Sequence, residues 1–319
     1  MKACAFRGPP PSKPIPSWSL RRAAAAAALA LLLFATADPA GAGTVDRVRD
    51  LGKLRIGYRT DARPFSYLDE SGQIAGYSVA LCQRIVDGLK ADLGLDRIAI
   101  QPVRLTSEDR FDAVKDGRLD LLCGASTATL ERRKSVDFSI PIFPSGIGAL
   151  VRENCPDRLK AALEGREPPS QPLWRAWLGQ GLEKRVLSAQ SGTTAETWLA
   201  QNHEELKLNA EIVPVKTYQE GVARVVAGTT DALFGDRSIL LNAAAGSQAA
   251  GDLVVLDRQY TYEPIALALA RDDDDFRLVV DRTLSRLYRS GEIKAIYRVY
   301  FGDPDADTLA FFGFVALPE

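Results

Sequence analysis

Short apolar runs alternate with longer amphipathic segments along most of this chain, and glycine or proline residues mark many of the boundaries. Apolar strands are predicted over residues 54–58 and 98–103, and helices over residues 79–89 and 107–115. In the first of these helices the apolar residues recur every three or four positions, which is the spacing of one helical face. Regular alternation of strands and helices is typical of a doubly wound α/β domain.

The same alternation resumes in the second half of the chain. The predicted strands cover residues 185–189, 211–215, 231–234 and 265–270, and the predicted helices cover residues 218–227, 238–245, 276–288 and 293–300. One domain usually spans about 100–200 residues. Two α/β series within 319 residues therefore predict two domains.

Two segments do not follow the alternation. Residues 154–181 contain clustered prolines together with Trp174 and Trp177, so we expect an irregular insertion packed on the second domain. The C-terminal tail, residues 306–319, carries three phenylalanines and is expected to dock on a domain, because it would otherwise expose an apolar patch. The sequence does not indicate what either segment does.

The first 43 residues have the composition of an export signal. Several basic residues precede the apolar stretch 23–37, which is too short for a flanked membrane-spanning helix, and small residues follow at positions 40–42. The interpretation is a cleaved signal peptide over residues 1–43, and the alternative is an uncleaved anchor. The mature protein is then expected to be soluble and periplasmic.

Charge, histidine and cysteine usage narrow the choice of function. The formal net charge is −1 without a large basic cluster, so there is no electrostatic case for binding nucleic acid. The only histidine is His203 and no metal-ligand spacing occurs, so no metal site and no cofactor are expected. Beyond the signal, Cys82, Cys123 and Cys155 allow one disulfide in an oxidising compartment. The sequence does not choose the pair, and Cys123 also fits its predicted strand as a small apolar residue.

A candidate anion-binding stretch lies at residues 119–139. A short apolar strand is followed by the hydroxyl residues Ser126 and Thr127, and Arg132 comes next, in a predicted short helix capped by Thr129. Hydroxyls and free backbone N–H groups suit one end of a small zwitterion, and a planar guanidinium binds two carboxylate oxygens at once. The alternative is an ordinary strand–loop–helix connection with a basic surface turn.

Five motifs, in this order, resemble those of the family 3 solute-binding proteins of amino-acid ABC importers. The matching segments are LRIGYRTDARPFSYLDESGQIAGYSVALCQRI, CGASTATLERRKSVDFSIPIF, SGTTAE, LFGDRSIL and RLYRSGEIKAIYRVYFG. The resemblance implies a two-lobe, type II periplasmic binding protein-like fold of two doubly wound α/β lobes, with crossover strands near residues 148–152 and 264–270. Lobe 1 would then comprise residues 44–148 and 264–319, and lobe 2 residues 149–263.

The resemblance assigns the ligand's charged groups to named residues. Arg132 matches the arginine that clamps the ligand α-carboxylate, and Asp236 matches the acid that pairs with the ligand ammonium. Ser126 and Thr127 match the hydroxyl and amide positions of the same loop, and Ala125 stands where a serine is often found. The structural alternatives are a surface arginine, ordinary loop chemistry and a helix N-cap at Asp236.

Thr193 and Thr194 open a predicted helix in the second lobe, within the SGTTAE motif. Free N–H groups and the helix dipole at such a terminus suit a carboxylate. The alternative is a plain capped helix.

Within this family the chain is most similar to the glutamate/aspartate-binding proteins. They carry an arginine in the first loop, as Arg59 is here, and the pattern TS-x-x-R, which supplies Ser107 and Arg110. Two extra guanidiniums favour a second carboxylate on the ligand. Tyr218 stands where those proteins place a histidine, so one positive charge is missing. Glutamine, asparagine or a small dicarboxylate remain open, as does structural ion pairing of the two arginines with nearby acids such as Asp61.

The expected protein is therefore the binding component of an ABC importer. It is expected to be a monomer that closes on a polar amino acid, with glutamate or aspartate foremost, and delivers it to an inner-membrane permease without chemistry of its own. One alternative is a dehydratase-like enzyme of the same fold, with Asp61 or Asp236 as its acid or base, but both carboxylates have simpler explanations. The other alternative is a ligand-sensing receptor component.

Overall fold

The structure is a computed structural model and describes residues 43–166 and 184–319. The predicted signal peptide, apart from Gly43, lies outside the described residues, and so do Trp174 and Trp177 of the predicted insertion. Within the described ranges, no helix combines the length and the apolar character that a membrane crossing needs.

The first sheet has five strands in the order β5-β1-β6-β15-β7. Its strands are β1 (Lys53–Arg59), β5 (Ala99–Leu105), β6 (Leu121–Leu122), β7 (Asp137–Phe138) and β15 (Ala268–Leu269). β1 lies parallel to both β5 and β6, whereas β15, which arrives from the far end of the chain, runs antiparallel to β6 and β7. This sheet and its helices form what we call lobe 1.

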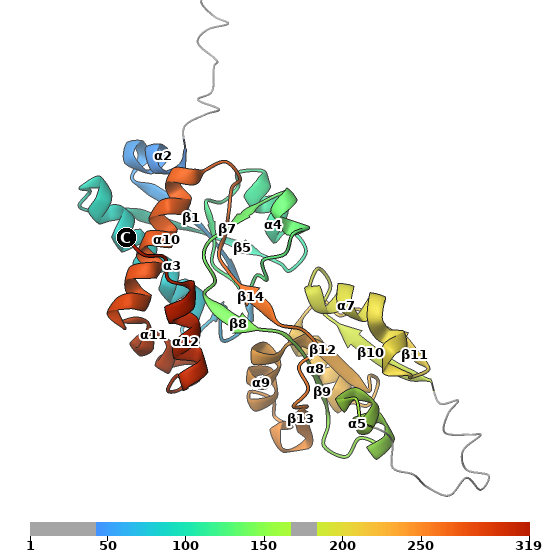
Figure 1. Ribbon diagram of the computed structural model, residues 1–319. Coiled ribbons are helices and arrows are strands. Elements are labelled where there is room, and N and C mark those ends of the chain that lie inside the picture. The colour runs from blue at the N-terminus through green and yellow to red at the C-terminus, as the bar shows by residue number, and fades with distance from the viewer. Residues whose placement is uncertain (1–42, 167–183) are drawn as a thin grey trace, which may run out of the picture. The chain divides into compact units, whose positions relative to one another are not determined.

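Six helices accompany the first sheet. They are α2 (Thr44–Leu51), α3 (Tyr77–Leu93), α4 (Arg110–Lys115), α10 (Asp274–Ser290), α11 (Ile293–Phe301) and α12 (Ala306–Val315). The C-terminal helices α10 and α11 contact α3, and α12 contacts α10 (Figure 1). A small sheet of β2 (Asp61–Ala62), β3 (Ser66–Leu68) and β4 (Ile74–Ala75) adjoins β1. Lobe 1 is therefore built from both ends of the described chain.

The second sheet has the order β11-β10-β12-β9-β13 and belongs to what we call lobe 2. Its strands are β9 (Ile147–Arg152), β10 (Arg185–Ala189), β11 (Ala210–Ile212), β12 (Ala232–Asp236) and β13 (Leu253–Val255). Its helices are α5 (Asp157–Glu164), α7 (Thr194–Asn202), α8 (Tyr218–Val226) and α9 (Arg237–Ala245). β10 and β12 are parallel, so their carboxyl ends, where ligand-type side chains were predicted, lie at the same edge.

A two-stranded ribbon connects the two sheets. It pairs β8 (Phe143–Ser145) with β14 (Glu263–Ile265) in antiparallel register. β8 connects β7 of the first sheet to β9 of the second, and β14 connects β13 of the second sheet back to β15 of the first. The first crossing therefore lies before the predicted residues 148–152, which form β9 inside the second sheet because they pair with β12 and β13.

Two local expectations were wrong or incomplete, and a third, the docking of the C-terminal tail, is confirmed. The predicted irregular insertion begins with a regular helix, α5, which starts after Pro156 and ends at Gly165. The short helix expected around Arg132 is a single 3-10 turn, η1 (Arg132–Lys134), preceded by a hydrogen bond from Arg132 N–H to the Thr129 hydroxyl. The C-terminal tail forms α12, whose Phe312 is buried against Tyr288.

The structure pairs two of the three cysteines that lie within the described residues. Cys82, on α3, and Cys123, just after β6, form a disulfide. Cys155 is a buried free thiol. The disulfide therefore ties α3 to the start of the loop that carries Ala125 and Thr127.

Candidate ligand-binding site

Nine of the eleven predicted site residues line one small cavity at the strand ends between the two lobes. The cavity volume is about 20 Å³, close to the space that one water molecule needs. The predicted residues that line it are Arg59, Arg110, Ala125, Thr127, Arg132, Thr193, Thr194, Tyr218 and Asp236. Ser107 and Ser126 are buried nearby but do not line it. Glu263, which was not predicted, lines it as well.

The two lobes approach closely at Gly192, in the turn before α7. Gly192 has φ +75°, a conformation that favours glycine, and a Cβ there would lie 2.7 Å from the carbonyl oxygen of Ser107. The Gly192 carbonyl accepts hydrogen bonds from Arg110 Nη2 at 3.0 Å and from Arg132 Nη2 at 3.4 Å. The backbone of Ser107 therefore lies against Gly192 at this edge of the site.

Arg59 is neutralised within the protein. Its Nε and Nη2 each donate to one oxygen of Asp61 at 2.9 Å, and Nη2 also donates to Gln190 Oε1 at 2.8 Å. Burial raises the pKa of Asp61, but the charge of Arg59 and the hydrogen bonds from Arg59 and Gln190 outweigh burial and hold that pKa below its usual value. Gln190 belongs to lobe 2, so this ion pair also joins the lobes. Of the two roles that the sequence left open for Arg59, the structure shows the ion pair with Asp61.

Arg110 is in a different situation. It is 2 % exposed, and within the described residues its Nε and Nη1 have no hydrogen-bond partner. Its guanidinium lies 4.4 Å from the centroid of the Phe111 ring. Burial, and then the charges of Arg59 and Arg132, lower its pKa well below the usual value. A buried cation with unsatisfied donors is costly unless an anion approaches it, so Arg110 is suited to receive one.

Arg132 is held by backbone from both lobes. Its Nη1 donates to the Thr127 carbonyl at 2.8 Å, and its Nη2 reaches Gly192 of lobe 2. Burial lowers its pKa to about 10, while the negative charge of Glu263 opposes that shift and Arg59 adds to it. Arg132 therefore remains cationic at neutral pH beside the hydroxyl loop.

Asp236 forms the acidic end of the cavity. Its Oδ1 accepts from the backbone N–H groups of Ser238 and Ile239 at 3.0 and 3.2 Å, so it caps α9. Its Oδ2 accepts from the Ser145 hydroxyl. Burial raises its pKa to about 6, the hydrogen bonds lower it, and the charge of Glu263 raises it further. The N-cap role and a place in the cavity are thus combined in one residue.

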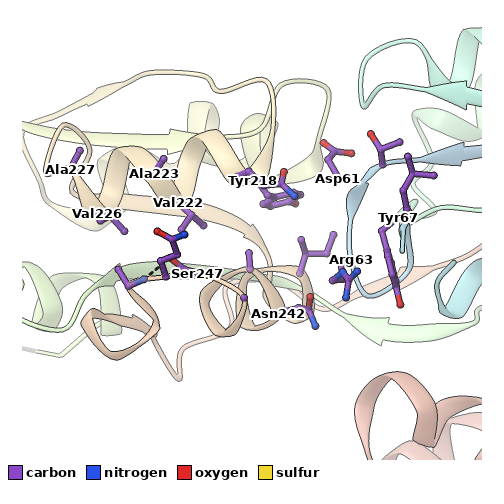
Figure 2. A pocket seen from close by; sticks show the side chains of 18 residues that line it. Asp61, Arg63, Tyr67, Tyr218, Val222, Ala223, Val226, Ala227, Asn242 and Ser247 are labelled. Atoms are coloured by element: carbon purple, nitrogen blue, oxygen red, sulfur yellow. Dashed lines mark hydrogen bonds between the residues drawn. The ribbon is translucent and has the colours of Figure 1, made fainter. Parts of the chain in front are cut away.

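Tyr218 lies beside Asp236 and, unlike a protonated histidine, brings no positive charge to the site. Its hydroxyl accepts from the backbone N–H of Asp236 at 3.3 Å, and burial raises its pKa above the usual value. Tyr218 and Ile239 also line a second, larger cavity of about 720 Å³. Figure 2 shows Tyr218 between Asp61 on one side and Val222 of α8 on the other. Tyr218 and Ile239 therefore form a wall shared by the two cavities.

The N-terminus of α7 and Glu263 complete the site. The Thr193 hydroxyl accepts from the Glu196 N–H at 3.3 Å, so Thr193 caps the helix. Glu263 Oε2 accepts from the hydroxyls of Thr127 at 3.0 Å and Thr194 at 2.7 Å. Sequence reasoning missed Glu263 because it stands at the start of an apolar strand segment, 136 positions from Thr127.

Two α/β lobes, a two-stranded connection and a polar cavity at the strand ends are features of the type II periplasmic binding protein fold. The sequence model of the bacterial extracellular solute-binding proteins, family 3, matches residues 54–303. The chain belongs to this family.

Similar proteins support a role in amino-acid ABC transport. The L-glutamate/L-aspartate-binding protein of Pseudomonas aeruginosa is 28% identical over 82% of this chain and 81% of that protein. The glutamate/aspartate import solute-binding protein of Escherichia coli is 26% identical over 89% of each chain. The L-cystine-binding protein TcyJ of the same organism is also 26% identical, over 82% of this chain and 86% of that protein.

One solved structure is similar in both sequence and fold. It is the ancestral amino acid-binding protein AncCDT-1, described as a precursor of cyclohexadienyl dehydratase. It has a TM-score of 0.64 and 26% identity, and the match covers 82% of this chain and all of that one.

Proposed function

We propose that this protein binds L-glutamate or L-aspartate between its two lobes and delivers it to an inner-membrane ABC permease. The observation that carries this proposal is Arg110, a buried guanidinium with two nitrogen donors that have no hydrogen-bond partner within the described residues. In any α-amino acid, the α-carboxylate would pair with Arg132 and the ammonium with Asp236. A third, unsatisfied charge of positive sign favours a ligand with a second carboxylate.

Each charged group of such a ligand has a counterpart in the cavity. The α-carboxylate faces Arg132 and the backbone N–H groups at the start of α7, the ammonium faces Asp236, and the side-chain carboxylate faces Arg110. Because the cavity volume is only about 20 Å³, entry of an amino acid requires the lobes or side chains to move apart. Contacts from both lobes then favour the closed arrangement by a population shift.

The proposed location is the periplasm, with the protein exported by the N-terminal signal and acting as a monomer. The Cys82–Cys123 disulfide supports this, because disulfides persist in oxidising compartments. The permease partner follows from the family alone. We propose no catalytic step, since the similar curated proteins cited above are all named as binding proteins.

The proposal is tested by a thermal-shift screen of the mature protein. L-glutamate or L-aspartate at a hundred times its Kd is expected to add about 2.7 kcal/mol to the free energy of unfolding, whereas the two amides and L-cystine at the same concentration add much less. Isothermal titration then gives the Kd. A larger stabilisation by glutamine, asparagine or cystine would show that Arg110 does not read a second carboxylate.

Binding is expected to depend on pH through Asp236. Its pKa is raised to about 6, so much of it is protonated at pH 5, and only the ionised form attracts the ligand ammonium. The ligand's own groups change little in this range. The affinity for L-glutamate should therefore improve roughly tenfold from pH 5 to pH 7, with proton release near pH 6. Titrations in buffers of different ionisation enthalpy measure that release, and a flat affinity profile without proton release contradicts the role of Asp236.

A further inference from the structure

Glu263 is, besides Asp236, the second acidic side chain that lines the candidate site. It lies on β14, in the ribbon that connects the lobes, and lines the same cavity as the three arginines. Its Oε2 accepts from the hydroxyls of Thr127, in lobe 1, and Thr194, in lobe 2. Its Oε1 accepts from the Thr261 hydroxyl at 2.9 Å. The carboxylate is therefore fixed by three hydroxyl donors.

These hydrogen bonds decide what the two cavity hydroxyls are able to do. A threonine hydroxyl has one proton to donate and two lone pairs with which to accept. With that proton directed to Glu263, the hydroxyls of Thr127 and Thr194 offer only lone pairs to anything else in the cavity. Lone pairs attract an ammonium group and repel a carboxylate.

The charge of Glu263 acts in the same direction. It raises the pKa of Asp236 and opposes the lowering of the Arg132 pKa, so its negative charge is felt at both ends of the cavity. An ammonium group in this cavity would therefore share it with two carboxylates, those of Asp236 and Glu263, and with two hydroxyl acceptors.

We infer that Glu263 is a positioning residue for the ligand ammonium: it takes the hydroxyl protons of Thr127 and Thr194 and so fixes both hydroxyls as acceptors. This inference rests on the proposed binding of an amino acid in this cavity, but it concerns the ammonium rather than the side chain. Glu263 thus helps to distinguish an amino acid from the corresponding acid that lacks the amino group.

The test compares L-glutamate with glutarate, which has both carboxylates and no ammonium. In the wild-type protein glutamate should bind more tightly than glutarate. In E263Q the amide N–H groups compete for the hydroxyl lone pairs, so the preference for glutamate over glutarate should fall roughly tenfold. A merely structural role would weaken both ligands equally. E153Q makes the same chemical change at an exposed position and should leave both affinities unchanged.

Thr194→Val supplies a second variant that does not depend on E263Q folding. It removes one acceptor and should lower the same preference, and the double variant should lose less than the sum of the two single changes. An unchanged preference in both variants overturns the inference. Tighter binding of both ligands in E263Q also overturns it, because Glu263 would then compete with the ligand carboxylate. If wild-type protein binds glutamine but not glutamate, the proposed ligand fails, and the same comparison is made with glutamine and its deamino analogue.

Discussion

Arg132→Ala is expected to abolish binding of every α-amino acid, whatever its side chain. Arg132 is positioned by the Thr127 carbonyl of lobe 1 and the Gly192 carbonyl of lobe 2, so it stands where both lobes meet the ligand. Removal of one partner of a buried, hydrogen-bonded charge pair costs about 2–5 kcal/mol, or roughly 30-fold to several thousand-fold in Kd. Lysine is not expected to rescue binding fully, because it lacks the planar fork.

Isothermal titration with L-glutamate measures this loss, and the chain provides a matched control next to it. Arg133 is half exposed and pairs with Asp137 at 3.6 Å, without lining the cavity. Arg133→Ala removes the same side chain one position away and should leave the Kd unchanged. Wild-type-like affinity in Arg132→Ala would remove Arg132 from the site and the carboxylate clamp with it.

The fold was predictable wherever an amphipathic period was long. The helix expected over residues 276–288 is α10 (Asp274–Ser290), with two more residues at each end. Two helices were missed for physical reasons. α12 carries bulky apolar side chains on more than one face, Phe312 buried and Phe314 91 % exposed, so it shows no clean helical period. α5 is only eight residues long and lies in a proline-rich region.

The site was predictable only as far as local motifs reach. Each of three features could be recognised from the residue types within one short segment: the hydroxyl loop, Arg132 and the start of α7. Gln190 and Glu263 gave no such signal, because each acts on groups more than a hundred positions away: Gln190 on Arg59, and Glu263 on Thr127. Whether Arg59 binds ligand or pairs with Asp61 also depends on tertiary contacts, and was left open by the sequence for that reason.

Arg110→Met is expected to separate ligand recognition from stability. Without the guanidinium, a second carboxylate enters the cavity without its proposed cationic partner, so the affinity for L-glutamate should fall by roughly a hundredfold and that for L-glutamine by much less. The protein without added ligand should become more stable, by about 1–3 kcal/mol. The reason is that an apolar side chain of similar length replaces a buried cation with two donors that are unpaired within residues 43–166 and 184–319.

Arg59→Met, the same substitution at another arginine of the cavity, is expected to have the opposite effect on stability. Arg59 has a bidentate partner, and its removal leaves the mostly buried Asp61 without a cation, although the neutral Gln190 amide still donates to it. The free energy of unfolding should therefore fall by about 3 kcal/mol. Chemical denaturation of the two variants, followed by titration with glutamate and glutamine, measures both effects. Equal losses of glutamate and glutamine in Arg110→Met would mean that Arg110 does not distinguish them. A destabilised Arg110→Met would mean that its buried charge already has a partner, and the second carboxylate of the ligand would no longer be required.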